Sequence, residues 1–240
     1  MEKYTFDTFI CGKSNELAFE VAKEVSENPG KVYNPLFIYS QGGLGKTHLL
    51  KAIQEEVQRR SPEKRVVYVT AVDWMNELLD CLRKNNRHDM QQFEKKFRDS
   101  DMLLIDDIQF VANKPYAQEL LTCTLKKLEI KQKGIVISSD VPVKKLSGVD
   151  ELLQSMFIGG LIVEIEKLDY HTRLRILRKL QEQFPDVIFE EEALEYIATN
   201  IYSNVRALEG AFHSLYSWMK LNTDVQKGQL DYKKILADYH

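Results

Sequence analysis

A glycine-rich turn between an apolar run and a helical pattern constrains the fold more than any other feature of the chain. Residues 36–39 are LFIY, residues 40–47 are SQGGLGKT, and residues 48–53 are HLLKAI. A strand, a turn and a helix in this order can cradle phosphate groups, because backbone N–H groups and the positive end of the helix point at the anion. In the pattern G-x-x-x-x-G-K-[ST], the lysine reaches the β and γ phosphates and the hydroxyl ligates Mg²⁺. Lys46 and Thr47 occupy those positions, and Ser40 stands where the first glycine belongs.

A second apolar run supports the nucleotide interpretation. Residues 102–105 are MLLI, and Asp106 and Asp107 follow them directly. A carboxylate at the end of a buried strand is where a P-loop fold presents its magnesium partner. The alternative is an ordinary glycine turn together with two acids that cap the next helix.

The spacing of apolar residues predicts an α/β fold. Strand-like runs lie at residues 36–39, 66–69, 102–105, 135–138 and 161–165, and helical patterns, including one over residues 15–27, lie between or before most of them. Near-continuous apolar strands that alternate with helices indicate a five-stranded parallel sheet between helices.

After about residue 166 the pattern predicts helices only. Asp169 and Ser203 are candidate N-caps of two helices, residues 190–199 form another, and a short one runs from Asp231 to Asp238. We therefore expect an α/β nucleotide-binding domain over residues 1–166 and a small all-helical lid over residues 167–240, the layout of an AAA+ P-loop NTPase.

Composition excludes several classes of protein. A net charge of −3 over 240 residues argues against a generally basic nucleic-acid binder, although a local basic patch remains possible. The N-terminus lacks the apolar core of a signal peptide, and no run approaches the roughly 20 apolar residues of a membrane span. Cys11, Cys81 and Cys123 fit no metal spacing and indicate reduced thiols in a cytoplasmic protein.

Five stretches of the chain resemble the AAA+ domain of the bacterial replication initiator DnaA family. They are spread in the family's order over about residues 5–238, and few P-loop proteins combine them. They are YNPLFIY at 33–39, GLGKTHL at 43–49, LLIDDIQF at 103–110, ISSD at 137–140 and SNVRALEGA at 203–211.

The resemblance implies a role for each matching residue. It implies that ATP or ADP binds with Mg²⁺, which Thr47 and Asp106 would hold, and that Asp107 orients the attacking water. Asp140 would lie in the sensor I loop, and Arg206 would be the sensor II arginine that reaches the γ-phosphate. The residues implied in nucleotide binding are Ile10, Gly12, Gly42, Gly43, Leu44, Gly45, Lys46, Thr47, His48, Asp140 and Arg206.

Three of these roles have simpler alternatives. Asp140 precedes Val141-Pro142 and could merely start a turn. Ile10 could be a core residue. Arg206 falls in the first turn of a predicted helix, where a cation is unfavourable without an anionic partner.

The chain also departs from the family. If position 40 requires a positive φ, Ser40 strains the phosphate loop and weakens nucleotide binding. Leu152 and Met156 stand where similar proteins have arginines, one of which is the arginine finger. An arginine finger supplied by a neighbouring copy raises the rate of nucleotide hydrolysis by about 10³–10⁵. Because this chain lacks that arginine, we expect impaired self-assembly and at most a weak ATPase.

The chain ends at His240, without the duplex-reading domain that follows in initiators and without their N-terminal helicase-interaction domain. It is either one domain of a longer protein or a naturally short relative, and the lost arginines favour a diverged, single-module relative.

A basic segment lies between the second and third strands, where initiators hold single-stranded DNA. Its cations could track phosphates, or they could form an ordinary solvated helix face. They are Arg83, Lys84, Arg87, Lys95, Lys96 and Arg98.

These observations leave three functions open. The leading one is an ATP- or ADP-binding regulator of chromosomal replication initiation that contacts a DnaA-type initiator or another replication protein. The second is a slow ATPase that remodels or loads a replication complex. The third is a single-stranded DNA-binding module without nucleotide switching.

Overall fold

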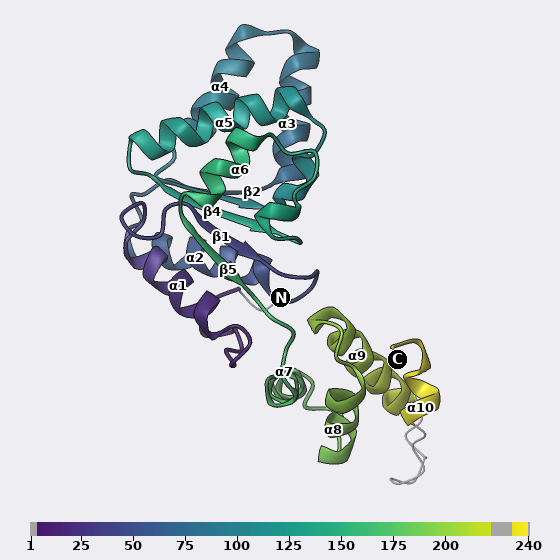
Figure 1. Cartoon of the computed structure of the whole chain (residues 1–240). Helices are drawn as coiled ribbons and strands as arrows, with labels where there is room; N and C mark the ends of the chain where they lie inside the picture. The colour runs from purple at the N-terminus through teal and green to yellow at the C-terminus, as the bar shows by residue number, and fades with distance from the viewer. Residues whose placement is uncertain (1–3, 222–231, 240) are drawn as a thin grey trace. The chain divides into compact units, whose positions relative to one another are not determined.

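The computed structural model describes residues 4–221 and 232–239, and the larger of its two compact units is built around one parallel sheet (Figure 1). The strand order is β2-β3-β4-β1-β5. In the register, Leu36 lies opposite Val136 on one side and Leu161 on the other. The strands confirm the five apolar runs and are β1 Leu36–Tyr39, β2 Val66–Thr70, β3 Met102–Asp106, β4 Gly134–Ser139 and β5 Leu161–Glu164.

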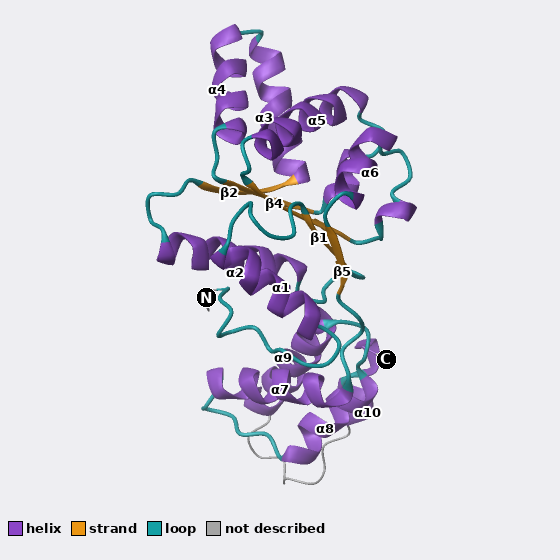
Figure 2. Ribbon diagram, turned by 60° about the vertical axis from the view of Figure 1, so that its left-hand side comes forward, coloured by secondary structure: helices purple, strands orange, loops and turns teal. Residues whose placement is uncertain are grey.

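Helices cover both faces of the sheet, as near-continuous apolar strands require. Figures 1 and 2 show α1 and α2 on one face and α3, α5 and α6 on the other, with α4 packed beside α3. The helices are α1 Glu16–Glu27, α2 Lys46–Arg60, α3 Ala71–Lys84, α4 Arg87–Arg98, α5 Pro115–Ile130 and α6 Glu151–Ile158.

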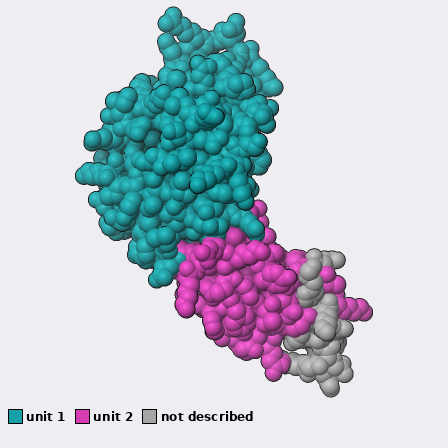
Figure 3. Space-filling view, in the orientation of Figure 1, with its two compact units in different colours: residues 1–9, 16–41, 45–165 teal, residues 10–15, 42–44, 166–240 magenta. Residues whose placement is uncertain are grey.

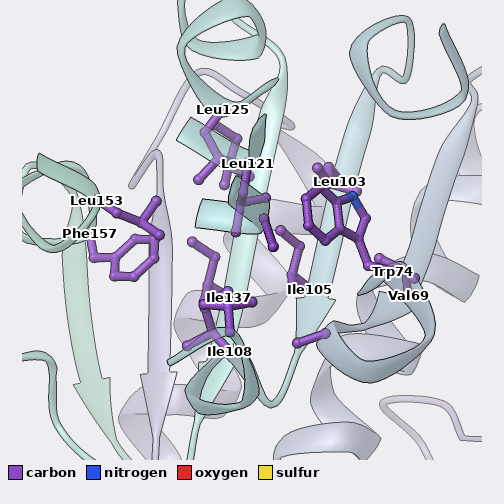
Figure 4. Packing of buried hydrophobic residues seen from close by; sticks show 14 of the residues in the cluster. Val69, Trp74, Leu103, Ile105, Ile108, Leu121, Leu125, Ile137, Leu153 and Phe157 are labelled. Carbon is purple, nitrogen blue, oxygen red and sulfur yellow. The ribbon is translucent and has the colours of Figure 1, made fainter. Parts of the chain in front are cut away.

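The larger part of the core lies between the sheet and α3–α6 (Figure 4). Alternate strand residues such as Leu103 and Ile105 point into it, because successive side chains of a strand leave opposite faces. Trp74 of α3 and Phe157 of α6 are almost fully buried there. This packing fixes the ends of β3 and β4, from which the site described below is built.

The described residues from 166 onward form the bulk of a second compact unit, together with residues 10–15 and 42–44 (Figure 3). Its described helices are α7 Tyr170–Gln183, α8 Glu191–Asn200, α9 Val205–Leu221 and α10 Tyr232–Ile235. The helical content expected after residue 166 is confirmed, whereas the role of residues 167–240 as a lid stays a prediction.

The expected helix ends in this unit are partly corrected. Asp169 caps α7 as predicted, because its carboxylate accepts the N–H of Thr172 at 2.8 Å. Ser203 does not cap α9, since Asn204 accepts the N–H of Ala207 at 2.9 Å instead. Serine and asparagine are equally good N-caps, so the sequence could not choose between neighbours. The predicted start of the last helix at Asp231 lies outside the described residues.

Within the described part of the chain, every helix is too short or too polar to cross a bilayer.

Candidate nucleotide-binding site

The sheet order brings three loops to one place. β3, β4 and β1 are neighbours, and the carboxyl ends of parallel strands meet at the same edge. The glycine-rich turn follows β1. Asp106 is the last residue of β3 and Asp107 follows it, while Asp140 follows β4. The polar residues that the sequence placed at three separate strand ends therefore converge.

The glycine-rich turn leaves the N-terminus of α2 open. Gly45 is the N-cap residue with a φ of 106°, and no side chain caps the first turn. Gly43 also has a positive φ, 78°. The free N–H groups and the positive end of the helix dipole therefore face the turn. Ser40 is not among the described residues with positive φ, so the strain considered for it in the sequence is absent.

Lys46 is buried beside this turn, with only 5% of its surface exposed. Its ammonium donates to Asp140 Oδ1 at 2.6 Å, to the carbonyl of Ser40 at 3.1 Å and to Ser40 Oγ at 3.2 Å. The carbonyl of Gln41 lies at 3.4 Å. A buried ammonium needs such acceptors, because an unpaired charge in the interior is strongly disfavoured. Asp140 is thus a partner of the P-loop lysine rather than only the start of a turn.

Three hydroxyl groups surround the carboxylate of Asp106, which is 1% exposed. Thr47 donates to Oδ2 at 2.7 Å and Tyr68 donates to the same oxygen at 2.8 Å. Ser138 donates to Oδ1. Burial and the negative charge of Asp106 raise the pKa of Tyr68, which keeps its hydroxyl protonated as a donor. These three hydrogen bonds fix the position of the carboxylate next to Thr47.

Asp107 occupies the left-handed region, with a φ of 59°, which is uncommon for a residue with a side chain. Its N–H donates to Ser138 Oγ at 2.9 Å, and its Oδ1 accepts weakly from Gln109 Nε2 at 3.4 Å. Gln109 also donates to Asp140 at 3.1 Å. Burial, and then the charge of Asp106, raise the pKa of Asp107 above its ordinary value.

Sequence reasoning missed three residues of this network: Tyr68, Ser138 and Gln109. Each belongs to a run that was read only for its strand pattern or as part of a motif. Ser138 carried a usable signal, because it is a polar residue near the end of a strand expected to be buried. Tyr68 did not, since a tyrosine in a strand more often packs than donates to a carboxylate.

Several implied nucleotide contacts lie in the second unit. Gly42, Gly43 and Leu44 belong to it, and the N–H of Val205 donates to the carbonyl of Gly43 at 2.9 Å. Ile10 is half-buried and outside the core, and Gly12 lies so close to Thr172 that a Cβ there would be 1.9 Å from its hydroxyl. The nucleotide contacts proposed for these residues stay predictions.

Arg206 and His48 have other surroundings. Arg206 is exposed in the first turn of α9, as predicted. His48 holds the N-terminal segment onto α2, because its Nε2 lies 2.9 Å from the carbonyl of Thr5 and its ring contacts Tyr4 and Phe9 edge-on. Their roles toward a nucleotide stay predictions.

The two positions that lack arginine lie on α6. Leu152 is 49% exposed, and Met156 packs partly against the core. The exposed side chain of Leu152 carries no charge. It therefore cannot stabilise an anion as an arginine at this position could. The residues of α6 include no cation, and the absence of an arginine finger stays a prediction.

The basic segment covers the C-terminal end of α3 and the whole of α4, and most of its cations form ion pairs with carboxylates. Lys96 donates to Glu77 at 2.6 Å, Arg98 contacts Glu94, Arg83 lies 3.4 Å from Asp80, and Lys84 lies 3.8 Å from Asp89. Only Arg87 and Lys95 of the six have no ion pair among the described residues, and both are exposed.

The residues present fit a nucleotide with its metal. The described part of the chain holds no cluster of three acidic, cysteine or histidine side chains that could bind a metal alone. Mg²⁺ keeps several waters and usually takes one or two protein oxygens plus phosphates. Thr47 Oγ1 and Asp106 Oδ2, 2.7 Å apart, are two such oxygens beside the open helix end.

Comparison with known proteins decides the family. Residues 1–164 match the bacterial DnaA ATPase domain. The chain belongs to this DnaA ATPase domain family. The chromosomal replication initiator DnaA of Lachnoclostridium phytofermentans is 42% identical over 219 residues, which are 91% of this chain and 48% of that protein. The chain thus spans about half the length of the curated relatives it matches.

Solved structures agree with this assignment and with the AAA+ fold. Domain III of the Thermotoga maritima replication initiation protein DnaA has a TM-score of 0.90 and 37% identity, over 100% of this chain and 98% of that one. A replication initiator DnaA bound to AMPPCP and single-stranded DNA has a TM-score of 0.82 and 35% identity, over 93% of this chain and 69% of that one. The DnaA-like fold expected from the sequence is confirmed.

Proposed function

We propose that this DnaA-family module binds ATP or ADP with Mg²⁺ at its P-loop and that it acts in the initiation of chromosomal replication. The buried ammonium of Lys46, set beside the uncapped N-terminus of α2, carries the proposal. A buried lysine at an open helix end is the arrangement that binds phosphates. The relative bound to AMPPCP supports an adenine nucleotide as the ligand.

Electrostatics make the binding depend on Mg²⁺. Asp106, Asp107 and Asp140 outnumber the single ammonium of Lys46, which leaves these four side chains with a formal charge of −2. A polyphosphate entering such a site is repelled unless a divalent cation enters with it. Thr47 and Asp106 would hold that cation, which neutralises phosphate charge when bound.

We expect this module to hydrolyse ATP slowly. Asp107 is held by the Ser138 hydroxyl and Gln109 and could orient a water. Leu152 and Met156 supply no charge to a neighbouring copy, and they present an apolar face instead of an arginine. The chain would therefore present nucleotide to a partner's arginine while offering none itself, so a DnaA-type initiator is the partner that fits best.

Single-stranded DNA is a second candidate ligand. The relative bound to single-stranded DNA, together with the exposed, unpaired Arg87 and Lys95, favours it. The four paired cations of α3 and α4 weaken this surface, because each must leave a carboxylate before it reaches a phosphate.

Thermal unfolding with and without ligand tests nucleotide binding. A ligand present at 100 times its dissociation constant stabilises a protein by about 2.7 kcal/mol. We expect ATP and ADP to raise the melting temperature only when Mg²⁺ is present, and Lys46→Ala to abolish the rise. Lys133→Ala is the matched control, because Lys133 pairs with Asp101 at 2.7 Å outside the site. An equal rise in Lys46→Ala would refute the proposal.

A further inference from the structure

Ser40 has a second place in the site beyond its position in the loop. It is 2% exposed, and its N–H donates to the carbonyl of Ser139 at 3.1 Å, which continues the β1–β4 pairing. Its hydroxyl donates to the carbonyl of Gln41 at 2.8 Å and so turns its lone pairs toward Lys46. A glycine at this position would keep the backbone contacts and lose only this acceptor.

The acceptors around Lys46 account for all its protons. An ammonium has three N–H groups. Asp140 takes one at 2.6 Å, the carbonyl of Ser40 takes another at 3.1 Å, and Ser40 Oγ at 3.2 Å is better placed for the third than the carbonyl of Gln41 at 3.4 Å. With Ser40 and Lys46 both buried, water has little access to replace the hydroxyl.

We propose that the Ser40 hydroxyl is a positioning group that satisfies Lys46 in the ligand-free protein and thereby lowers its affinity for nucleotide. The inference rests on the proposed nucleotide binding. Without the hydroxyl, one proton of a buried ammonium lacks a good acceptor, and such a defect is costly. A phosphate oxygen supplies the missing acceptor, so the ligand-free state is destabilised more than the bound state and binding becomes tighter.

The test is a double-mutant cycle with two readouts. Ser40→Ala, Lys46→Met and the double variant are compared with the wild type by titration with ATP and Mg²⁺ and by thermal unfolding without ligand. Ser100→Ala is the matched control, because Ser100 is fully buried and its hydroxyl donates only to the carbonyl of Phe97 at 2.8 Å. The cycle isolates the pairwise contribution of Ser40 and Lys46.

We expect Ser40→Ala to bind ATP about three- to tenfold more tightly, since a tenfold change corresponds to about 1.4 kcal/mol. Its ligand-free melting temperature should fall by roughly 2–4 °C, and the fall should shrink in the Lys46→Met background. Ser100→Ala should leave the affinity unchanged.

Unchanged or weaker affinity in Ser40→Ala would overturn the inference, and so would an equal loss of melting temperature in both backgrounds. Failure of the proposed function looks different. In that case the wild type and Ser40→Ala both fail to bind ATP, while the unfolding cycle still reports whether the hydroxyl satisfies Lys46.

Discussion

Ser138 is the residue whose replacement most sharply tests the geometry of the site. Its hydroxyl is fully buried, donates to the carboxylate of Asp106 and accepts the N–H of Asp107 at 2.9 Å. Ser138→Ala leaves the half-buried N–H of Asp107 without its partner, which costs about 1 kcal/mol, and removes one hydrogen bond to a charged group, worth about 1.5–3 kcal/mol. Asp106 keeps its bonds from Thr47 and Tyr68. We therefore expect the free energy of unfolding to fall by about 2.5–4 kcal/mol.

Urea denaturation followed by the fluorescence of Trp74 measures this change. Trp74 is buried in the core beneath β3, and a Trp218→Phe background removes the only other tryptophan. Ser100→Ala is the comparison, since its hydroxyl makes one bond to a backbone carbonyl and should cost about 1 kcal/mol. A loss in Ser138→Ala no larger than the loss in Ser100→Ala would refute the reasoning.

Three further predictions concern charge. Asp107→Asn should raise the free energy of unfolding at pH 7, because the folded state holds the pKa of this carboxyl above its ordinary 3.8 and its ionisation therefore destabilises the fold. In urea titrations the gain in free energy should vanish below pH 3.8, where the carboxyl is protonated in both states. A gain independent of pH would contradict the burial argument. Arg87→Ala and Lys95→Ala should each weaken single-stranded DNA binding and reduce the slope of log affinity against log salt concentration by about 0.7. Lys96→Ala should reduce this slope less, because Lys96 is paired with Glu77. A larger effect of Lys96→Ala than of the other two would exclude this surface. Leu152→Arg should raise phosphate release from ATP more than tenfold at high protein concentration, because it supplies a cation to the nucleotide of a neighbouring copy. The loss of stability should be small, since position 152 is exposed. Unchanged phosphate release would argue against assembly through α6.

The sequence predicted the fold well, because apolar strand runs and glycine turns are local signals. All five strands form within a residue or two of their expected ranges. The order of the strands in the sheet was not predicted, since periodicity alone does not specify which strands pair. The cap of α9 was missed by one residue because Ser203 and Asn204 are chemically equivalent at that position.

The site was predicted less completely. Lys46 lies beside Asp140 and Thr47 beside Asp106, since the motifs set them at the ends of neighbouring strands, whereas their roles toward a nucleotide stay predictions. The two hydroxyl partners of Asp106 that were not predicted, Ser138 and Tyr68, are 32 and 38 positions away in the chain, and no local pattern encodes such pairings. Conversely, the strain suggested for Ser40 did not occur, because the need for a positive φ belongs to Gly43 and Gly45 instead.

Calorimetric titration of the chain with ATP, in the presence and absence of Mg²⁺, tests the nucleotide-binding proposal most directly. The account predicts one site per chain, with strong dependence on Mg²⁺ and loss of binding in Lys46→Ala. Heats that stay at the level of dilution at millimolar ATP and Mg²⁺, with the protein shown to be folded by circular dichroism, would contradict it.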